Sequence, residues 1–250
     1  DMVGYWSFDS YNSTHVLDES GNNLHGIINN NVSFREGISG RSVNFDGFND
    51  TVVIQNAPVI NSTMWSVSAW ANFKRKNSHV LFSFSNGGYP RVELSHYQGN
   101  DPLRAYPLLY LNFGVDDYYR YGQRVFADSR WHHLVYVFND QTNLVKIYVN
   151  GEDDTGIGPD GNEALITPNW IISAYNSNSI NGSVDELRVF ARNLSFREVR
   201  DLYYFNKINF EITTGLNKIS VYGCRLQNGQ AYNVVAFTDL QKAELEVIVR

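Results

Sequence analysis

The sequence predicts an all-β protein, because its apolar residues gather in short alternating runs separated by turn-forming residues. Residues 65–73 and 133–138 are such runs, and clusters of Gly, Asn, Asp and Pro lie between them. Asn150-Gly151 follows a further run, and this dipeptide is a strong hairpin signal because both residues tolerate positive φ. Tyr and Phe number 16 and 15 among 250 residues, and charged residues make up only 18%, which favours strands over helices. Many short strands at regular spacing indicate a sandwich or a barrel.

The composition also restricts the partners of the chain. Its formal net charge is -6 and it has no basic run, so we expect no nucleic acid partner, because Lys and Arg neutralise the phosphates in such complexes. No stretch approaches the roughly 18 to 20 consecutive apolar residues that span a bilayer, so we expect no membrane insertion by this segment. The one cysteine, Cys224, excludes an internal disulfide framework and is expected as a buried thiol, with an intermolecular bridge as the alternative.

One short helix is predicted near residue 200. Ser195 and Glu198 form a capping box, in which each side chain satisfies a free backbone N–H group of the first turn. Apolar residues then recur at helical spacing to about residue 205. We expect this helix to cover the sandwich as a lid.

The pattern changes after residue 206, so the sequence predicts two parts, 1–206 and 207–250. Strands are predicted in the second part at residues 209–213, 218–226, 231–238 and 243–249. Asn228-Gly229 would join the middle two as a hairpin. A segment this short is marginal on its own without disulfides or metals. We therefore expect a small antiparallel β appendage that packs on the first part or on another copy of the chain.

A family resemblance is carried by a series of segments that occur in the family's order: residues 4–9, 18–26, 40–47, 65–70, 131–136, 145–151 and 181–190. The Trp131-His132-His133 start of one strand and the strand after it are similar to that family's most recognisable hairpin. On these segments, residues 1–206 resemble the laminin-G-like branch of the concanavalin A-like lectin and glucanase superfamily, whereas residues 207–250 have no recognised counterpart. The resemblance implies a two-sheet antiparallel jelly-roll sandwich that works by binding, outside the cell or at a cell or virion surface.

The resemblance also implies one structural calcium ion between the closing strand and the early loops. Its ligands would be the carboxylate of Asp185 and backbone carbonyl groups near Asp9 and Gly47. Residues 46–50, with Asn49, offer oxygens of the kind that Ca²⁺ prefers, and Gly47 allows a sharp turn. The alternative is that the side chains of residues 46–50 only make turn hydrogen bonds.

Catalysis is not expected, although the superfamily includes glucanases. Glycoside hydrolysis needs two carboxyl groups roughly 5 to 9 Å apart, and the family's Glu-x-Asp-x-(x)-Glu strand motif is missing. Asp185 and Glu186 are adjacent and would point to opposite faces of a strand. Glu152 and Asp154 follow a turn, where solvated charges are expected. No Gly-x-Ser-x-Gly elbow occurs, and the pair His132-His133 is expected to be structural, with one ring facing inward and the other facing solvent.

Glycan binding is the chemistry that the aromatic residues favour. Tyrosine rings stack on sugar faces while carboxylates and guanidinium groups bind hydroxyls. The candidate ligand-binding residues are Asp117, Tyr118, Tyr119, Arg120 and Tyr121, with Tyr89 on a further candidate surface. The alternative is a tyrosine-rich strand whose alternate rings are simply buried.

Asn-x-Ser/Thr sequons would be glycosylation sites if the chain is secreted. They occur at Asn12, Asn31, Asn49, Asn61, Asn181 and Asn193.

The function that the sequence favours is a non-catalytic binding or adhesion module for a glycan or a surface protein. The first alternative is a structural subunit of a filament, pilus, surface layer or virion, in which residues 243–249 would insert as a strand into a neighbouring copy. The second alternative, a glycoside hydrolase, is disfavoured by the missing carboxylate motif.

Overall fold

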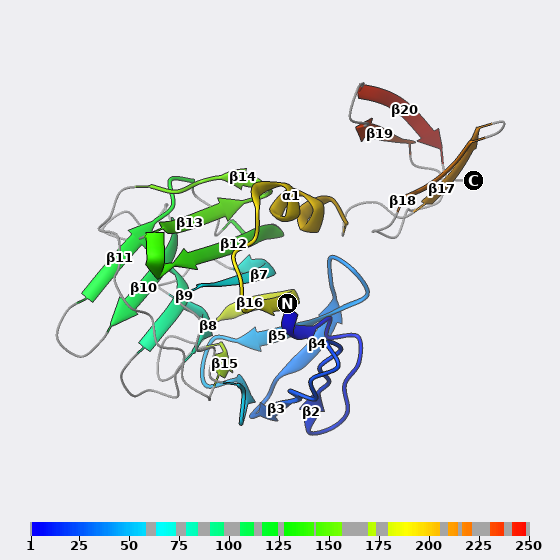
Figure 1. Cartoon of the computed structure of the whole chain (residues 1–250). Helices are drawn as coiled ribbons and strands as arrows, with labels where there is room; N and C mark the ends of the chain where they lie inside the picture. The colour runs from blue at the N-terminus through cyan, green and yellow to red at the C-terminus, as the bar shows by residue number, and fades with distance from the viewer. Residues whose placement is uncertain are drawn as a thin grey trace. The chain divides into compact units, whose positions relative to one another are not determined.

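The computed structural model of the chain consists mainly of short strands (Figure 1). It describes residues 2–58, 64–73, 79–84, 91–97, 106–112, 117–124, 128–142, 144–156, 170–173, 180–205, 210–214, 217–221, 231–237 and 242–248. The chain divides into two compact units, Asp1–Tyr203 and Tyr204–Arg250.

Two antiparallel sheets make up the first unit. The first sheet has the strand order β14-β13-β12-β7-β16-β5-β4, with β1 paired to β16, and the second has the order β11-β10-β9-β8-β15-β6-β3-β2. The strands of the first sheet are β1 (Met2–Trp6), β4 (Ser33–Glu36), β5 (Arg41–Asp46), β7 (Met64–Phe73), β12 (His132–Asn139), β13 (Leu144–Val149), β14 (Glu152–Asp153) and β16 (Asn181–Phe190). Those of the second sheet are β2 (His15–Val16), β3 (Gly26–Asn29), β6 (Thr51–Ile54), β8 (His79–Ser83), β9 (Arg91–Tyr97), β10 (Tyr106–Asn112), β11 (Asp117–Tyr121) and β15 (Trp170–Ile172). The predicted two-sheet antiparallel jelly-roll sandwich is confirmed.

The core lies between the two sheets and is rich in aromatic rings. Four of them form a series of edge-to-face contacts from one sheet to the other. The ring centroid of Trp6 lies 6.5 Å from that of Trp170, Trp170 lies 5.4 Å from Phe84, and Phe84 lies 5.2 Å from Trp65. All four side chains are fully buried. Because each such ring pair adds about 0.5 to 1.5 kcal/mol beyond the burial of its area, this series helps to fix the two sheets relative to each other.

A second, smaller apolar cluster lies on the outer face of the first sheet, beneath the helix α1 (Phe196–Phe205). Its buried members are Val135, Val137, Tyr148, Phe190, Leu194 and Val199. The predicted capping box begins the helix: the Ser195 N–H donates to a Glu198 carboxylate oxygen at 2.8 Å, and the Glu198 N–H donates to Ser195 Oγ at 3.3 Å. The short lid helix that the sequence predicts is confirmed.

The second unit contains two antiparallel strand pairs. β17 (Phe210–Thr214) pairs with β18 (Asn217–Val221), and β19 (Ala231–Phe237) pairs with β20 (Lys242–Ile248). The sequence predicted a hairpin between the middle two strands, whereas the structure pairs the first with the second and the third with the fourth. The connections inside these pairs, residues 215–216 and 238–241, have the lengths that suit β-hairpins. Asn228, Gly229 and Cys224 lie outside the described residues.

Candidate functional site

Three tyrosines lie together at one edge of the second sheet, where β11 is the edge strand. Tyr110 of β10 is the register partner of Tyr119, and Leu108 is the partner of Tyr121. The rings of Tyr110 and Tyr119 are 5.0 Å apart, and those of Tyr119 and Tyr121 are 6.2 Å apart and nearly parallel, at 11°. The alternate residue of β10, Leu109, is fully buried in the core. The three rings therefore stand on the face of the sheet that is turned away from the core, and we call Tyr110, Tyr119 and Tyr121 the tyrosine face.

Arg120 lies on the other side of the same strand. Its register partner is the core residue Leu109, and its Nη1 donates a hydrogen bond to the Gly156 carbonyl oxygen at 3.2 Å. The guanidinium group and the rings of Tyr119 and Tyr121 thus do not share a face. Of the other candidate residues, Asp117 and Tyr118 lie in β11, where the structure describes their backbone but not their side chains. Tyr89 lies outside the described residues.

Asp154 fixes the end of the tyrosine strand. Its side chain is only 1% exposed, and its carboxylate accepts the Gln123 N–H at 2.9 Å and the Arg124 N–H at 3.1 Å. A Cβ on Gly122 would stand 2.4 Å from the same carboxylate, so this position requires glycine. The Gly156 N–H donates to the Tyr121 carbonyl oxygen at 2.8 Å. These contacts tie the edge of the second sheet to the segment that follows β14 in the first sheet.

Sequence reasoning missed this role of Asp154 because it expected a solvated charge after the Asn150-Gly151 turn. Burial raises the pKa of the Asp154 carboxyl, although the N–H groups of Arg124 and Gln123 act in the opposite direction. The partners of Asp154 lie about 30 residues earlier in the chain, so no local sequence pattern predicts the contact.

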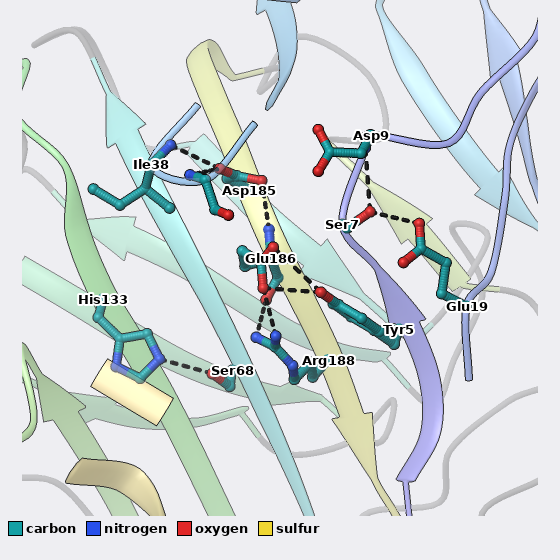
Figure 2. A network of polar contacts seen from close by, with 11 residues as sticks. Tyr5, Ser7, Asp9, Glu19, Ile38, Ser68, His133, Asp185, Glu186 and Arg188 are labelled. Carbon is teal, nitrogen blue, oxygen red and sulfur yellow. Dashed lines mark hydrogen bonds and ion pairs between the residues drawn. The ribbon is translucent and has the colours of Figure 1, made fainter. Parts of the chain in front are cut away.

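A buried polar network occupies the point where β16 changes neighbours (Figure 2). β16 pairs with β5 through Val184 and with β1 from Leu187 onward. At the junction the strand bulges, and Glu186 has a φ of 54°. The fully buried Asp185 carboxylate accepts the N–H groups of Ile38 and Ser39 at 2.8 and 3.1 Å. It therefore holds the turn between β4 and β5.

Glu186 is also buried, and it forms an ion pair with Arg188. The Tyr5 hydroxyl donates to Glu186 at 3.1 Å, and the Arg188 guanidinium lies 4.3 Å from the centre of the Tyr5 ring. The sequence expectation that Asp185 and Glu186 point to opposite faces assumed a regular strand, and the bulge breaks that alternation. Burial raises the pKa of the Tyr5 hydroxyl, Arg188 lowers it, and Glu186 raises it further, so this hydroxyl stays a donor. The network is internally satisfied and acts as a structural clamp.

The sequence match decides the family. A model described as the concanavalin A-like lectin/glucanases superfamily (Laminin_G_3) matches residues 45–200, which is more than half of the chain. The chain belongs to the concanavalin A-like lectin/glucanase superfamily. No curated protein sequence matches the chain significantly.

Solved structures support the same superfamily fold. Domain 4 of AbnA, a GH43 extracellular arabinanase from Geobacillus stearothermophilus in complex with arabinotriose, superposes with a TM-score of 0.64 at 19% identity, covering 81% of this chain and 98% of that domain. The binding domain of Paraclostridial Mosquitocidal Protein 1 has a TM-score of 0.64 at 16% identity, covering 98% of this chain and 63% of that one. The binding domain of Botulinum Neurotoxin DC in complex with SialylT has a TM-score of 0.64 at 12% identity, covering 93% of this chain and 57% of that one.

The three solved structures cover different shares of this chain. Asp1–Tyr203 makes up about four fifths of the chain, the share that the arabinanase domain covers. The two toxin binding domains cover 98% and 93%, so their likeness extends into Tyr204–Arg250. The chain spans less than two thirds of either toxin domain. At these identities the likeness concerns the fold alone.

The calcium ligands that the superfamily resemblance implies fall into two separate pairs. Asp9 and Asp185 both lie against residues 37–40: a Cβ on Gly40 would meet the Asp9 carboxylate, and Asp9 accepts the Arg41 N–H. Gly47 and Asn49 lie beyond the opposite end of β5, where Gly47 packs against Asn181. A strand of this length separates the two pairs by roughly 15 Å.

The donors around these carboxylates are N–H groups, whereas a calcium ion needs oxygen ligands. No group of three or more His, Cys, Asp or Glu side chains in the described part of the chain is arranged to hold a metal ion. As placed, the four residues do not fit one calcium site, and calcium binding by the chain stays a prediction.

Both histidines of the superfamily-like Trp-His-His segment make hydrogen bonds. His133 is fully buried, with Nε2 2.8 Å from Ser68 Oγ (Figure 2). His132 lies between Asp128, 2.9 Å from Nε2, and Asn150, 3.1 Å from Nδ1. Because Asn150 Oδ1 accepts the His133 N–H, its Nδ2 must be the atom that donates to His132 Nδ1. His132 then carries its proton on Nε2 and donates it to Asp128, so the arrangement orients a turn.

The sequon asparagines differ in accessibility. Asn12, Asn31 and Asn49 are exposed, Asn181 and Asn193 are half-buried, and Asn61 lies outside the described residues. Glycosylation at these residues stays a prediction. In the described part of the chain no helix is both long and apolar enough to cross a membrane.

Proposed function

We propose that the chain is a non-catalytic glycan-binding module that acts outside the cell or at a cell or virion surface, and that it binds saccharide on the tyrosine face. The observation that carries the proposal is the pair of nearly parallel, half-buried rings of Tyr119 and Tyr121 on the outward face of an edge strand. Two half-buried aromatic rings on an outward face offer apolar surface against which sugar rings can pack.

Hydrogen-bonding residues occupy nearby register positions. Glu93 of β9 is the register partner of Tyr110, and Asp117 of β11 is the partner of Asn112. Carboxylates accept hydrogen bonds from sugar hydroxyls, so acidic residues at these register positions suit a saccharide. The arabinanase domain and the neurotoxin domain were solved with arabinotriose and SialylT respectively, and this precedent on the same fold supports the proposal.

The absence of catalysis is part of the proposal. The buried carboxylates of Asp18, Asp50, Asp154 and Asp185 each accept backbone N–H groups. A glycosidase needs one carboxyl group to reach the leaving oxygen and another to reach the sugar or a water, and carboxylates engaged in this way serve structure instead. Incubation with soluble polysaccharides should release no reducing sugar.

The test is binding to a glycan array followed by titration of the best ligand. Replacing both tyrosines, Tyr119→Ala with Tyr121→Ala, should weaken the affinity at least about tenfold, because both stacking surfaces are lost. The matched control is Tyr204→Ala, which removes an exposed tyrosine of α1 and should leave the affinity unchanged. The proposal is wrong if the wild-type chain binds no glycan, or if the double variant binds as tightly as the wild type.

A second candidate is assembly through the second unit. β17–β18 and β19–β20 are separate two-stranded sheets in the described part of the chain, and a two-stranded sheet offers backbone groups to a further strand. Light scattering after size-exclusion chromatography over a range of concentrations tests it. Growth in mass with concentration that disappears on removal of residues 243–250 would support assembly, and a constant monomer mass would exclude it.

A further inference from the structure

A second aromatic surface lies at the opposite edge of the sandwich. The ring of Tyr11 stacks on that of Phe34, with centroids 3.6 Å apart and an angle of 6° between the planes. Phe34 belongs to β4 and packs against the main core. Tyr11 keeps 40% of its surface exposed. One face of the Tyr11 ring is thus supported by a side chain anchored in the core, and the ring remains accessible to a ligand.

The turn that carries Tyr11 is held rigidly. Asn12 Oδ1 accepts three hydrogen bonds, from the Thr14 N–H at 2.8 Å, the His15 N–H at 2.8 Å and the Thr14 hydroxyl at 3.0 Å. Tyr11 itself forms an antiparallel bridge with Val16. A ring held in this way loses little conformational freedom when a ligand stacks on it, and such pre-organisation favours binding.

A hydrogen-bond donor stands next to the ring. The three hydrogen bonds of the Asn12 side chain all use Oδ1, and no hydrogen bond joins its Nδ2 to another described residue. An exposed amide nitrogen beside a supported aromatic ring combines the two elements that recognise a sugar, a flat apolar surface and a directed polar group.

We infer that Tyr11, with Asn12, forms a second saccharide-binding site, which takes one pyranose or furanose ring independently of the tyrosine face. The sugar would stack its apolar C–H face on Tyr11, and one of its hydroxyls would accept a hydrogen bond from Asn12 Nδ2.

The two surfaces are too far apart to contact the same short saccharide. β4 and β14 are at opposite edges of the first sheet, six strand intervals apart. The Asp154 segment joins the β14 edge to the tyrosine strand. With about 4.8 Å between strands, the Tyr11 site lies about 30 Å from the tyrosine face. The chain would therefore bind two monosaccharides or short oligosaccharides at once.

The test is an NMR titration of ¹⁵N-labelled chain, produced in bacteria so that Asn12 carries no glycan. The probes are methyl glycosides of glucose, galactose, N-acetylglucosamine and arabinose, together with sialyllactose, each raised well above about 1 mM, the range of weak binding. The amide signals of residues 11–15 should shift with at least one probe, and they should shift equally in the chain that carries Tyr119→Ala and Tyr121→Ala. That independence separates this site from the proposed function.

Two substitutions distinguish binding from a merely covering role of Tyr11. Tyr11→Leu keeps an apolar cover over Phe34 but removes the aromatic face, so the affinity read at residues 11–15 should fall about tenfold or more while the melting temperature stays close to that of the wild type. Tyr11→Phe keeps the ring and should bind as the wild type does. Phe48→Leu, at another exposed aromatic residue, is the control. Unshifted amides with every probe, or unchanged affinity in Tyr11→Leu, would overturn the inference.

Discussion

Asp18 and Asp185 are both buried aspartates that hold turns through backbone N–H groups, yet their carboxyl groups ionise differently. Asp18 accepts the N–H groups of Tyr5, Ser20 and Leu24 at 2.9 to 3.0 Å. Burial raises its pKa, but these donors and the Ser20 hydroxyl outweigh burial, and the pKa is lowered. Burial raises the pKa of Asp185 to about 8, and the negative charge of Glu186 adds to the rise against three N–H donors.

The difference shows that the number of hydrogen bonds does not decide the charge of a buried carboxyl group. Both side chains accept N–H groups from three residues, so the donors alone would make both anionic. Asp185 is fully buried and stands next to a second buried acid, whereas Asp18 gains a hydroxyl donor and has no acidic residue among the causes that shift its pKa. Asp185 therefore keeps its proton to a higher pH than Asp18 does, because its pKa is raised and that of Asp18 is lowered.

Among the substitutions compared at pH 7, the largest loss of stability is expected for Asp18→Asn. The new amide nitrogen would face N–H donors that now point at an anion, and at least one buried donor would lose its partner. Loss of such a charged, multiply bonded acceptor should lower the free energy of unfolding by about 3 kcal/mol. Urea unfolding at pH 7 measures it. Glu19→Gln is the control, because Glu19 is exposed and accepts only the Ser7 hydroxyl among its described contacts. Equal stability of the two variants would contradict the charged state of Asp18.

Asp154→Asn should have the next largest effect, about 2 kcal/mol. Asp154 has a raised pKa, as Asp185 has, but it also faces the Arg124 guanidinium at 3.4 Å. Its loss should speed hydrogen exchange at the amides of Gln123 and Arg124, and it should weaken glycan binding on the tyrosine face although Asp154 does not touch that face. Exchange rates that stay as in the wild type would show that the strand end is held by its other contacts.

The pH dependence of the free energy of unfolding tests the difference between Asp185 and Asp18. The pKa of Asp185 is raised from near 4 to about 8, so the folded chain binds a proton more tightly than the unfolded chain does. The contribution of the Asp185 carboxyl group to the free energy of unfolding is complete below pH 4. It is lost as the pH rises toward and through 8, and the free energy then falls by at most about 1.4 kcal/mol per pH unit. Asp18, with a lowered pKa, contributes above pH 4 and loses its contribution on acidification.

The measurement is urea unfolding at a series of pH values from 4 to 9. Asp185→Asn should remove most of the decline in stability between pH 5 and 8, and the rise in the pKa of Asp154 should account for the part that remains. Asp18→Asn should leave the slope in this window as it is. An unchanged slope in Asp185→Asn would mean that Asp185 is already ionised at neutral pH.

The smallest effect is expected from calcium. Because the Asp185 carboxylate already accepts backbone N–H groups and the four implied residues lie in two separate pairs, addition of a chelator should change the melting temperature by less than the few degrees that about 1 kcal/mol produces in a chain of this size. A larger fall, reversed by added calcium, would instead support the calcium ion that the superfamily resemblance implies.

The sequence predicted the elements whose causes are local. The alternation along residues 65–73, the Asn150-Gly151 turn and the capping box at Ser195 each depend on neighbouring residues, and each is found in the structure. The sequence predicts residues 117–121 as one cluster of ligand-binding candidates. The two-residue period of a strand instead places Tyr119 and Tyr121 on one face and Arg120 on the other.

What the sequence could not predict depends on contacts between distant residues. Asp154 meets Gln123, Asp185 meets Ile38, and Tyr11 meets Phe34, and none of these pairs has a local pattern. The bulge at Glu186 lies where β16 leaves β5 and joins β1, two strands that are distant from it in the sequence. The calcium residues were assigned by likeness to a family, and that likeness does not fix which end of β5 each residue occupies.

The tryptophans give the chain a built-in optical reporter. Trp6, Trp65, Trp70 and Trp170 are at most 1% exposed, and Trp131 is half-buried. The emission of the four buried tryptophans should be short in wavelength and resistant to aqueous quenchers in the native state, and it should move to long wavelength when the sandwich unfolds. Both proposed sugar surfaces consist of tyrosine, so ligands should leave this emission almost unchanged. The tryptophan emission can thus show that a variant is folded before its affinity for a ligand is measured.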